Sequence, residues 1–179
     1  MTINAKLESP EVLYAADEVV TVSREQVDEL VTASRTTPRE RIRLCTHRDT
    51  ADPVHEMLIV HAAGTYVRPH KHVDKAESFH VIEGRVDVVL FDEQGALKDV
   101  IRMGDYATGL PFYYRIDQPI FHTLLIRSGV LVFHETTSGP FRREQTVFAS
   151  WAPEETSLEV AGFIASVDER AQTHLKQSL

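Results

Sequence analysis

The sequence lacks most of the features that assign a protein to a special class. It has one cysteine, Cys45, among 179 residues, so an intrachain disulfide is impossible. It has no apolar run near the ~18 residues that a membrane-spanning helix needs, no internal repeat and no low-complexity segment. The N-terminal stretch MTINAKLESPEV lacks the basic and apolar regions of a signal peptide. We therefore expect a cytoplasmic protein that does not enter a membrane.

An excess of basic residues is also missing. The chain has 19 Lys and Arg against 27 Asp and Glu, a formal net charge of −8. Such a surface repels nucleic acid and anionic lipid, so we expect neither as a partner. A small-molecule substrate remains the expected partner, and it can be anionic, because a pocket can be basic on an acidic protein.

The middle of the chain has the pattern of a β-protein. Short runs rich in Val, Ile, Tyr and Phe follow one another from residue 56 to residue 136, among them EMLIVHA, SFHVIEG, VDVVLF, FHTLLIR and VLVFHET. Turn signals such as Glu-Gly and Ser-Gly separate them. Many short strands at even spacing predict an all-β sandwich or barrel.

Both ends of the chain differ from this pattern. Ser23 and Gln26 have the spacing of a capping box, which predicts a short helix in SREQVDELVTASR with an apolar face at Val27, Leu30 and Val31. The tail carries a stripe at helical spacing, which we expect to pack on the β body or across a dimer interface: Val160, Phe163, Ile164, Val167, Ala171 and Leu175.

The length suits one domain. We divide it into an N-terminal arm and helix (1–54), a barrel (55–150) and a C-terminal helical extension (151–179). Residues 1–20 are expected to form an arm or a short edge strand. In the basic connection over 36–53, Arg41 and Arg43 belong to a solvated face or alternate as on a strand and point into a pocket.

The stretch GTYVRPHKHVDKAESFHVIEG, residues 64–84, contains the candidate metal-binding residues. Alternate side chains of a strand share a face, so His70 and His72 point the same way and can chelate one ion. If the next run pairs back against this strand, Glu77 returns to that face. Three convergent ligands are better explained by a metal site than by chance, and the alternative is a barrel that keeps these residues without binding metal.

The spacing Gly64–x5–His70–x–His72–x4–Glu77–x6–Gly84 resembles the first motif of the cupins, small double-stranded β-helix barrels. The resemblance implies a jelly-roll fold in which His70, His72 and Glu77 bind metal. It also implies a homodimer, since dimers are common among cupins.

The second cupin motif supplies a further histidine, and His122 is the residue that fits. It lies eighteen residues after Gly104, where the family pattern has eleven, and Asp117-Gln118-Pro119 stands in place of Pro-x-Gly. His122 still follows a turn and begins a β-rich run, so we expect it to be the fourth ligand.

A wider likeness covers roughly residues 28 to 165. The stretches RTTPRERIRLCTHRDTADP, GPF and FASWAPEE resemble the cupin group named WbuC, which is associated with O-antigen polysaccharide gene clusters. This resemblance implies a fold and a metal rather than a substrate.

Single histidines elsewhere are expected to be surface or satisfied core residues: His47, His55, His61, His80, His134 and His174. His80 lies three positions from Glu77, so on a strand it faces away from that residue.

Glu135 is a further candidate for the site. If Ser128-Gly129 is a two-residue hairpin turn, His122 lies opposite Glu135 on the neighbouring strand. The carboxylate would then orient the imidazole or act as a base beside the metal. The alternative is a strand end that faces solvent.

Tyr66 and Arg68 share the parity of the two motif histidines, so both are predicted to reach the cavity, whereas Lys71 faces outward. An arginine there suits a substrate carboxylate or phosphate. The run Tyr113-Tyr114-Arg115 either lines the mouth of the pocket or packs in the core.

Three neutral imidazoles and one carboxylate leave a divalent ion with one net positive charge and, if it is six-coordinate, two open positions. Fe(II), Mn(II), Ni(II), Cu(II) and Zn(II) all suit such ligands. Three functions follow: a Lewis-acid enzyme that isomerises, epimerises or cleaves a chelating sugar-like compound or hydroxy or keto acid, an Fe(II) dioxygenase, and a non-catalytic binding module for a sugar-like ligand.

Overall fold

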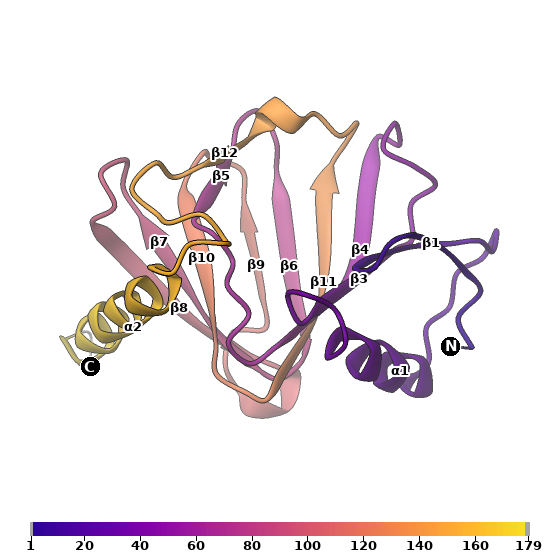
Figure 1. Ribbon diagram of the computed structural model, residues 1–179, viewed down its shortest axis with the longest axis horizontal. Coiled ribbons are helices and arrows are strands. Elements are labelled where there is room, and N and C mark those ends of the chain that lie inside the picture. The colour runs from indigo at the N-terminus through magenta and orange to yellow at the C-terminus, as the bar shows by residue number, and fades with distance from the viewer. Residues whose placement is uncertain (1, 178–179) are drawn as a thin grey trace.

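The computed structural model describes residues 2–177 as two β-sheets that face each other, with one α-helix on the outside of each (Figure 1). The first sheet has seven strands in the order β1-β2-β3-β4-β11-β6-β9. Their bounds are Ala5–Ser9 (β1), Val12–Ala15 (β2), Arg41–Cys45 (β3), Val54–Ala62 (β4), Val130–Ser138 (β11), Glu77–Glu83 (β6) and Tyr113–Ile116 (β9).

The second sheet has five strands in the order β12-β5-β10-β7-β8. Their bounds are Thr146–Phe148 (β12), His70–His72 (β5), Phe121–Ile126 (β10), Arg85–Phe91 (β7) and Leu97–Gly104 (β8). Two short 3-10 helices, η1 (Tyr106–Thr108) and η2 (Arg143–Gln145), lie in the connections. From β4 to β12 the chain changes sheet at every step except β7 to β8, so the architecture is a jelly-roll barrel.

Strand alternation divides the apolar residues of β4 between two of the three apolar clusters. On β4, Met57 and Ile59 point between the sheets, where they pack with Phe79 and Phe133. Leu58 and Val60 point to the other side, beneath helix α1. A strand buried on both faces needs a nearly continuous apolar run, and the MLIV run of β4 supplies it.

Helix α1 (Arg24–Ser34) begins where the capping box predicts. The Ser23 side chain accepts a hydrogen bond from the Gln26 backbone, and the Gln26 side chain accepts one from the Ser23 backbone. Val27 and Leu30 are buried against the outer face of the seven-stranded sheet. This helix is therefore fixed by a local signal at its start and by an apolar face along its length.

Helix α2 (Val160–Gln177) packs on the outer face of the five-stranded sheet. Val167 and Ala171 are its buried residues, and Phe163, Ile164 and Leu175 of the stripe pack against the same cluster. The structure thus places the stripe on the β body. No helix in residues 2–177 is both long and apolar enough to cross a membrane.

The predicted hairpin between β10 and β11 is wrong. The two strands belong to different sheets: β10 pairs with β5 and β7, whereas β11 pairs with β4 and β6. Ser128 and Gly129 form the crossing between the sheets, where the Ser128 hydroxyl bonds to the backbone of both Arg85 and Val130. A short Ser-Gly turn fits such a crossing as well as a hairpin, and the local sequence does not distinguish the two.

The predicted fold class, an all-β jelly-roll barrel of the cupin type with a short N-terminal helix and a C-terminal helix, is confirmed. Of the two alternatives for residues 1–20, the edge strand is the correct one, since β1 and β2 lie at the edge of the first sheet and β3 joins them to β4. A cavity lined by residues of both sheets opens at one end of the barrel.

Candidate metal centre

The four predicted ligands come together inside the barrel. His70 and His72 lie on β5, His122 lies on β10 of the same sheet, and Glu77 lies on β6 of the facing sheet. Each offers one ligand atom, and these atoms all lie within 4.8 Å of one another. The site therefore joins the two sheets, and its geometry depends on both.

Strand pairing positions the three imidazoles. His122 and His70 are direct cross-strand partners, and their rings lie 4.6 Å apart. His72 follows on the same face of β5, with its ring 5.1 Å from that of His70. Strand alternation puts His70 and His72 on one face of β5, and the pairing of β10 with β5 adds His122 to them.

Backbone carbonyls fix the orientation of two rings. His70 donates its Nδ1 proton to the carbonyl of Arg68 at 2.9 Å, and His122 donates its Nδ1 proton to the carbonyl of Ile120 at 3.0 Å. A carbonyl can only accept, so Nε2 of each ring is left as the unprotonated, ligating nitrogen. Metal-binding histidines in proteins are commonly held in this way.

The carboxylate of Glu77 is held from two sides. Its Oε1 accepts a hydrogen bond of 2.7 Å from the Tyr114 hydroxyl, and its Oε2 lies 2.9 Å from His72 Nε2. Oε1 also lies 3.7 Å from His122 Nε2. The sequence leaves Tyr114 undecided between the pocket mouth and the core. It lies on β9, directly beside β6, and is buried.

The protonation states suit metal binding. Burial, followed by the neighbouring His122, lowers the pKa of His70 to about 3, so the ring is neutral. Burial pushes the pKa of Glu77 upward, but the three histidines, His122 foremost, outweigh it and hold that pKa below its usual range. The neutral imidazole of His70 and the ionised carboxylate of Glu77 are forms that bind a divalent ion.

The donor set passes a simple test of fit. Atoms that share one ion at bond lengths of about 2.0–2.2 Å lie at most about 4.4 Å apart. The observed spread, within 4.8 Å, needs only small side-chain adjustments. Three nitrogen donors and one oxygen donor suit Fe, Mn, Ni, Cu or Zn and do not select among them.

A cavity of about 700 Å³ extends from this cluster to the outside. Its lining includes Arg68, Glu135 and both arginines of β3, Arg41 and Arg43. On β3 the apolar Ile42 and Leu44 are buried beneath helix α1, so alternation turns the two arginines to the cavity. Of the two alternatives for this basic stretch, pointing into a pocket is the correct one.

Glu135 reaches the cavity by a different route from the one predicted. It lies on β11 between Met57 of β4 and Phe79 of β6, and the cross-strand partners of His122 are His70 and Leu90. Its carboxyl therefore faces the cluster from the seven-stranded sheet. No side chain among the described residues makes a hydrogen bond or ion pair with it.

The surroundings of Glu135 favour its protonated form. Burial, reinforced by the negative charge of Glu77, raises its pKa to about 8, while Lys75 and Arg43 oppose the rise. A carboxyl group that titrates near neutral pH in a cavity is suited to proton transfer.

Tyr66 does not line this cavity, which corrects the parity argument. Its hydroxyl donates to the carbonyl of Pro153 at 3.0 Å, and its ring contacts Phe163 of α2. The residues before β5 are not in a regular strand, so parity counted back from His70 fails at Tyr66. Arg68, two residues from His70, does line the cavity.

The remaining histidines lie outside the cluster. His80 is exposed on β6 and faces away from the cavity, as alternation predicts. His47 and His55 are buried and stack on each other with ring centres 4.3 Å apart. His61 is buried in the cavity wall, where burial lowers its pKa to about 3.

Comparison with known proteins gives a fold-level likeness. A family model described as a domain of unknown function, DUF6016, matches residues 22–103, just under half of the chain. No curated protein matches. A variant of oxalate decarboxylase from Bacillus subtilis is 17% identical with a TM-score of 0.44, over 54% of this chain and 24% of that one. The chain thus spans about a quarter of that enzyme's length.

Two other solved structures are similar at the same level. A protein from Shewanella oneidensis is 11% identical with a TM-score of 0.49, over 70% of this chain and 79% of that one. The cupin domain of Schizosaccharomyces pombe Cnp3 is 11% identical with a TM-score of 0.43, over 55% of this chain and 64% of that one. The metal centre therefore rests on the geometry of this chain alone.

Proposed function

We propose that this protein is a metal-dependent enzyme of the cupin type that acts on a small polar chelating substrate. The substrate is sugar-like or a hydroxy or keto acid, and the reaction is an isomerisation, an epimerisation or a lyase cleavage. The observation that carries the proposal is the convergence of His70, His72, Glu77 and His122 at the inner end of an open cavity, with the carboxyl of Glu135 in the same cavity.

In this proposal the four convergent side chains hold one divalent ion. When bound, such an ion supplies Lewis-acid polarisation of a carbonyl or hydroxyl oxygen. Tyr114 keeps the Glu77 carboxylate in place through its 2.7 Å hydrogen bond. The carbonyls that accept from His70 and His122 keep the ring nitrogens directed at the centre.

Glu135 is the group that we assign to proton transfer. In its ionised form, a carboxylate oxygen of Glu135 accepts a proton from a carbon or hydroxyl of the bound substrate. The protonated carboxyl then returns that proton to another atom of the substrate. With a pKa raised to about 8 by burial, the carboxyl can exchange a proton near neutral pH. Arg68, in the same cavity wall, is assigned to contact with a polar group of the substrate.

The first test is elemental analysis of protein purified without a chelator or a metal-affinity column. We expect about one divalent ion per chain in the wild type and near-complete loss in His72→Ala. His80→Ala is the matched control, because this histidine lies on the outer face of β6 and its loss leaves the cluster intact. A wild type that contains no metal and takes none up on reconstitution would refute the proposal.

The identity of the ion then separates two reaction classes. Zinc, manganese or nickel favours Lewis-acid chemistry, and oxygen uptake is then expected to be absent with any substrate that turns over. Iron with substrate-dependent oxygen consumption would replace this proposal with the dioxygenase alternative. Binding of sugar-like compounds without turnover would leave a non-catalytic binding module.

Three finer proposals come from the sequence alone. We propose that the chain is related to the WbuC group and to O-antigen polysaccharide metabolism, that it is a homodimer, and that it acts in the cytoplasm. The dimer is the most direct to test, by light scattering of the purified chain at several concentrations.

A further inference from the structure

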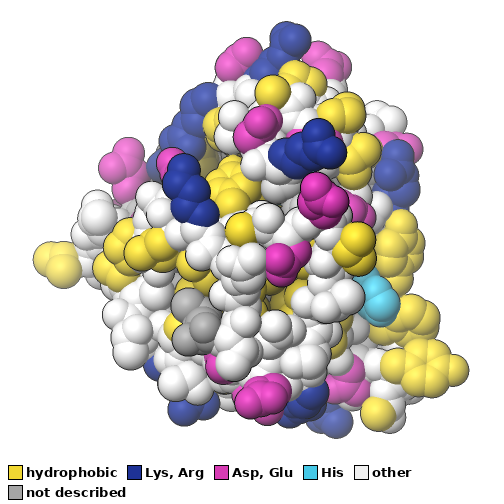
Figure 2. Space-filling view, turned by 90° about the vertical axis from the view of Figure 1, so that its right-hand side faces the viewer, with side chains coloured by type: hydrophobic (Ala, Val, Ile, Leu, Met, Phe, Trp, Pro, Cys, Tyr) yellow, Lys and Arg dark blue, Asp and Glu magenta, His cyan; other side chains and the backbone are white. Residues whose placement is uncertain are grey.

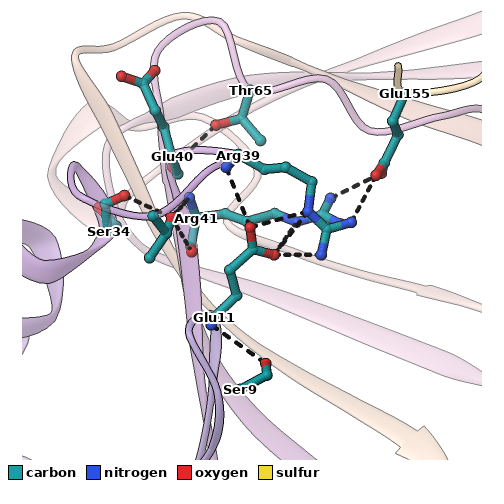
Figure 3. A network of polar contacts seen from close by, with 9 residues as sticks. Ser9, Glu11, Ser34, Arg39, Glu40, Arg41, Thr65 and Glu155 are labelled. Carbon is teal, nitrogen blue, oxygen red and sulfur yellow. Dashed lines mark hydrogen bonds and ion pairs between the residues drawn. The ribbon is translucent and has the colours of Figure 1, made fainter.

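The outer end of the cavity contains a charge network that the metal centre does not use. Arg39 and Arg41 bind two carboxylates there, those of Glu11 and Glu155 (Figure 3). All four residues line the cavity. They come from the β1–β2 turn, the approach to β3, β3 itself and the segment that follows β12, so the network is assembled only by the fold.

The two carboxylates have different environments. The Glu11 side chain is only 8% exposed. It accepts hydrogen bonds from the Arg39 backbone at 3.2 Å and from the Arg39 guanidinium, and it lies 3.4 Å from Arg41 Nε. Glu11 is thus a fixed part of the wall that sets the direction of both guanidinium groups.

The Glu155 carboxylate is more open to exchange. Its side chain is 31% exposed, and it accepts from Arg39 Nη1 at 2.6 Å and lies 3.2 Å from Arg41 Nη1. Among the described residues, its side chain makes no other hydrogen bond or ion pair. Since partly exposed ion pairs contribute little free energy, an acid group from outside can compete with Glu155.

The backbone that precedes Glu155 is anchored by hydrogen bonds to the segment before β5. Residues 149–153 are held by the Ala149 N–H, which donates to the carbonyl of Pro69 at 2.9 Å, and by the Tyr66 hydroxyl, which donates to Pro153. Residues 154–156 line the cavity beyond these anchors and are exposed. Glu155 can therefore leave the arginines without disturbing the buried part of the segment.

Arginine is unusually frequent around this cavity. Five arginines line it, at positions 39, 41, 43, 68 and 143, on a chain whose net charge is −8. Arg43 and Arg143 have no carboxylate within ion-pairing distance in the part of the chain that the structure describes. On the outer face that carries β1 and α1, by contrast, acidic and basic side chains are interspersed (Figure 2).

We propose that Arg39 and Arg41 form a binding subsite for an acid group, a carboxylate or a phosphate, of a small-molecule ligand, and that Glu155 occupies this subsite when no ligand is bound. Two guanidinium groups already oriented by Glu11 present several N–H donors to one anion, the arrangement that suits carboxylate and phosphate oxygens. Insofar as the ligand is the substrate, the inference rests on the proposed function, but binding of the acid group itself needs no metal.

The test measures anion binding to metal-free protein, by calorimetry with inorganic phosphate and separately with acetate. Glu155→Gln removes the internal competitor, so we expect binding about five- to tenfold tighter than in the wild type. Glu159→Gln is the matched control, because it makes the same charge change nearby on an exposed residue that does not line the cavity. It should leave the dissociation constant within about twofold of the wild-type value.

A second substitution tests the arginines. Arg41→Gln in the Glu155→Gln background should weaken binding about tenfold or more, whereas Arg41→Lys, which keeps the charge but loses the planar fork, should give an intermediate value. Circular dichroism and thermal unfolding establish that each variant is folded. Should Arg41→Gln not fold, the Nε–Hε resonances of the arginines in Glu155→Gln give a second readout, since Arg39 and Arg41 should shift on adding phosphate.

Three results would overturn the inference: equal affinities of Glu155→Gln and Glu159→Gln, unchanged affinity on loss of Arg41, or no binding of either anion by Glu155→Gln. If the network only holds the C-terminal segment against the barrel, Glu155→Gln and Glu159→Gln should bind the anions equally, and Glu155→Gln should be less stable than the wild type. Binding of phosphate alone indicates a phosphorylated ligand, and binding of acetate indicates a carboxylic acid.

The metal content of the same wild-type samples is measured in parallel. Anion binding without metal uptake would support the subsite and refute the proposed enzyme. Metal uptake without anion binding would support the proposed enzyme and refute the subsite.

Discussion

The hydrogen bond from Tyr114 to Glu77 gives the sharpest test of the metal centre. Tyr114→Phe removes one hydroxyl and keeps the ring, which stacks on Phe79 with ring centres 5.1 Å apart. The lost bond is 2.7 Å long and ends on a buried carboxylate whose other partner for that oxygen, His122, lies 3.7 Å away. The substitution therefore changes the support of one ligand and very little else.

The magnitude follows from the charge on the acceptor. A hydrogen bond to a charged group contributes about 1.5–3 kcal/mol to stability, so the metal-free variant should lose that much free energy of unfolding. For a chain of this size, about 1 kcal/mol shifts the melting temperature by about 2–4 °C, so we expect a decrease of about 3–12 °C. Loss of a residue that orients a ligand weakens metal binding about 10- to 100-fold.

The assay compares Tyr114→Phe with Tyr113→Phe. Tyr113 is the neighbouring residue on β9, it is half-exposed, and its hydroxyl donates to Ser78 Oγ at 3.2 Å. Its substitution should change stability by less than about 0.5 kcal/mol. Denaturant unfolding of the metal-free proteins and competition with a chelator for the metal give the two quantities. If Tyr114→Phe matched Tyr113→Phe in both, the claim that this bond positions Glu77 would be refuted.

Three further results are expected. Because burial and the charge of Glu77 raise the pKa of Glu135 from 4.5 to about 8, this group favours the folded state below pH 4.5, and that contribution is lost as the pH rises through 8. The stability of the wild type relative to Glu135→Gln should therefore fall over this range, and a flat difference would contradict the raised pKa. Gly84 has φ +97° and an added Cβ would clash with the Val130 carbonyl, so Gly84→Ala should cost at least about 2 kcal/mol; Gly129→Ala, with open space around it, should cost much less, and equal losses would argue against this geometry. If the protein carries metal, its removal should lower the free energy of unfolding by about 2.7 kcal/mol relative to a free ion concentration one hundred times Kd, as thermal unfolding with and without chelator would show.

The local part of the metal centre could be predicted from the sequence. His70 and His72 share a face because they lie two residues apart on one strand, and Glu77 follows within the next short turn. Strand parity describes the histidine pair well, but the expected pairing of the Glu77 run with the His70–His72 strand is wrong: β6 lies in the facing sheet, and Glu77 reaches the site from there. The helix start at Ser23 was predictable for the same reason, since a capping box is complete within four residues.

Two predictions that depended on counting strand positions over a longer stretch of sequence were wrong in their geometry. Tyr66 lies four residues before β5 in irregular backbone, so its parity carried no information. Glu135 was named as a candidate on the basis of a hairpin that does not exist, and it faces the cavity because β11 lies beside β6 in the other sheet. Neither the crossing at Ser128-Gly129 nor the pairing of β10 with β5 has a local signal.

What the sequence by itself determined is the strands from β4 to β11, the two helices and the three candidate ligands between His70 and Glu77, because side-chain alternation and capping act over a few residues. The tertiary structure decided which sheet each strand joins. It thereby placed His122 beside His70, Tyr114 beneath Glu77, and Glu155 between Arg39 and Arg41. Such neighbours come from strands and loops far apart in the chain, and their meeting is set by the packing of the two sheets against each other.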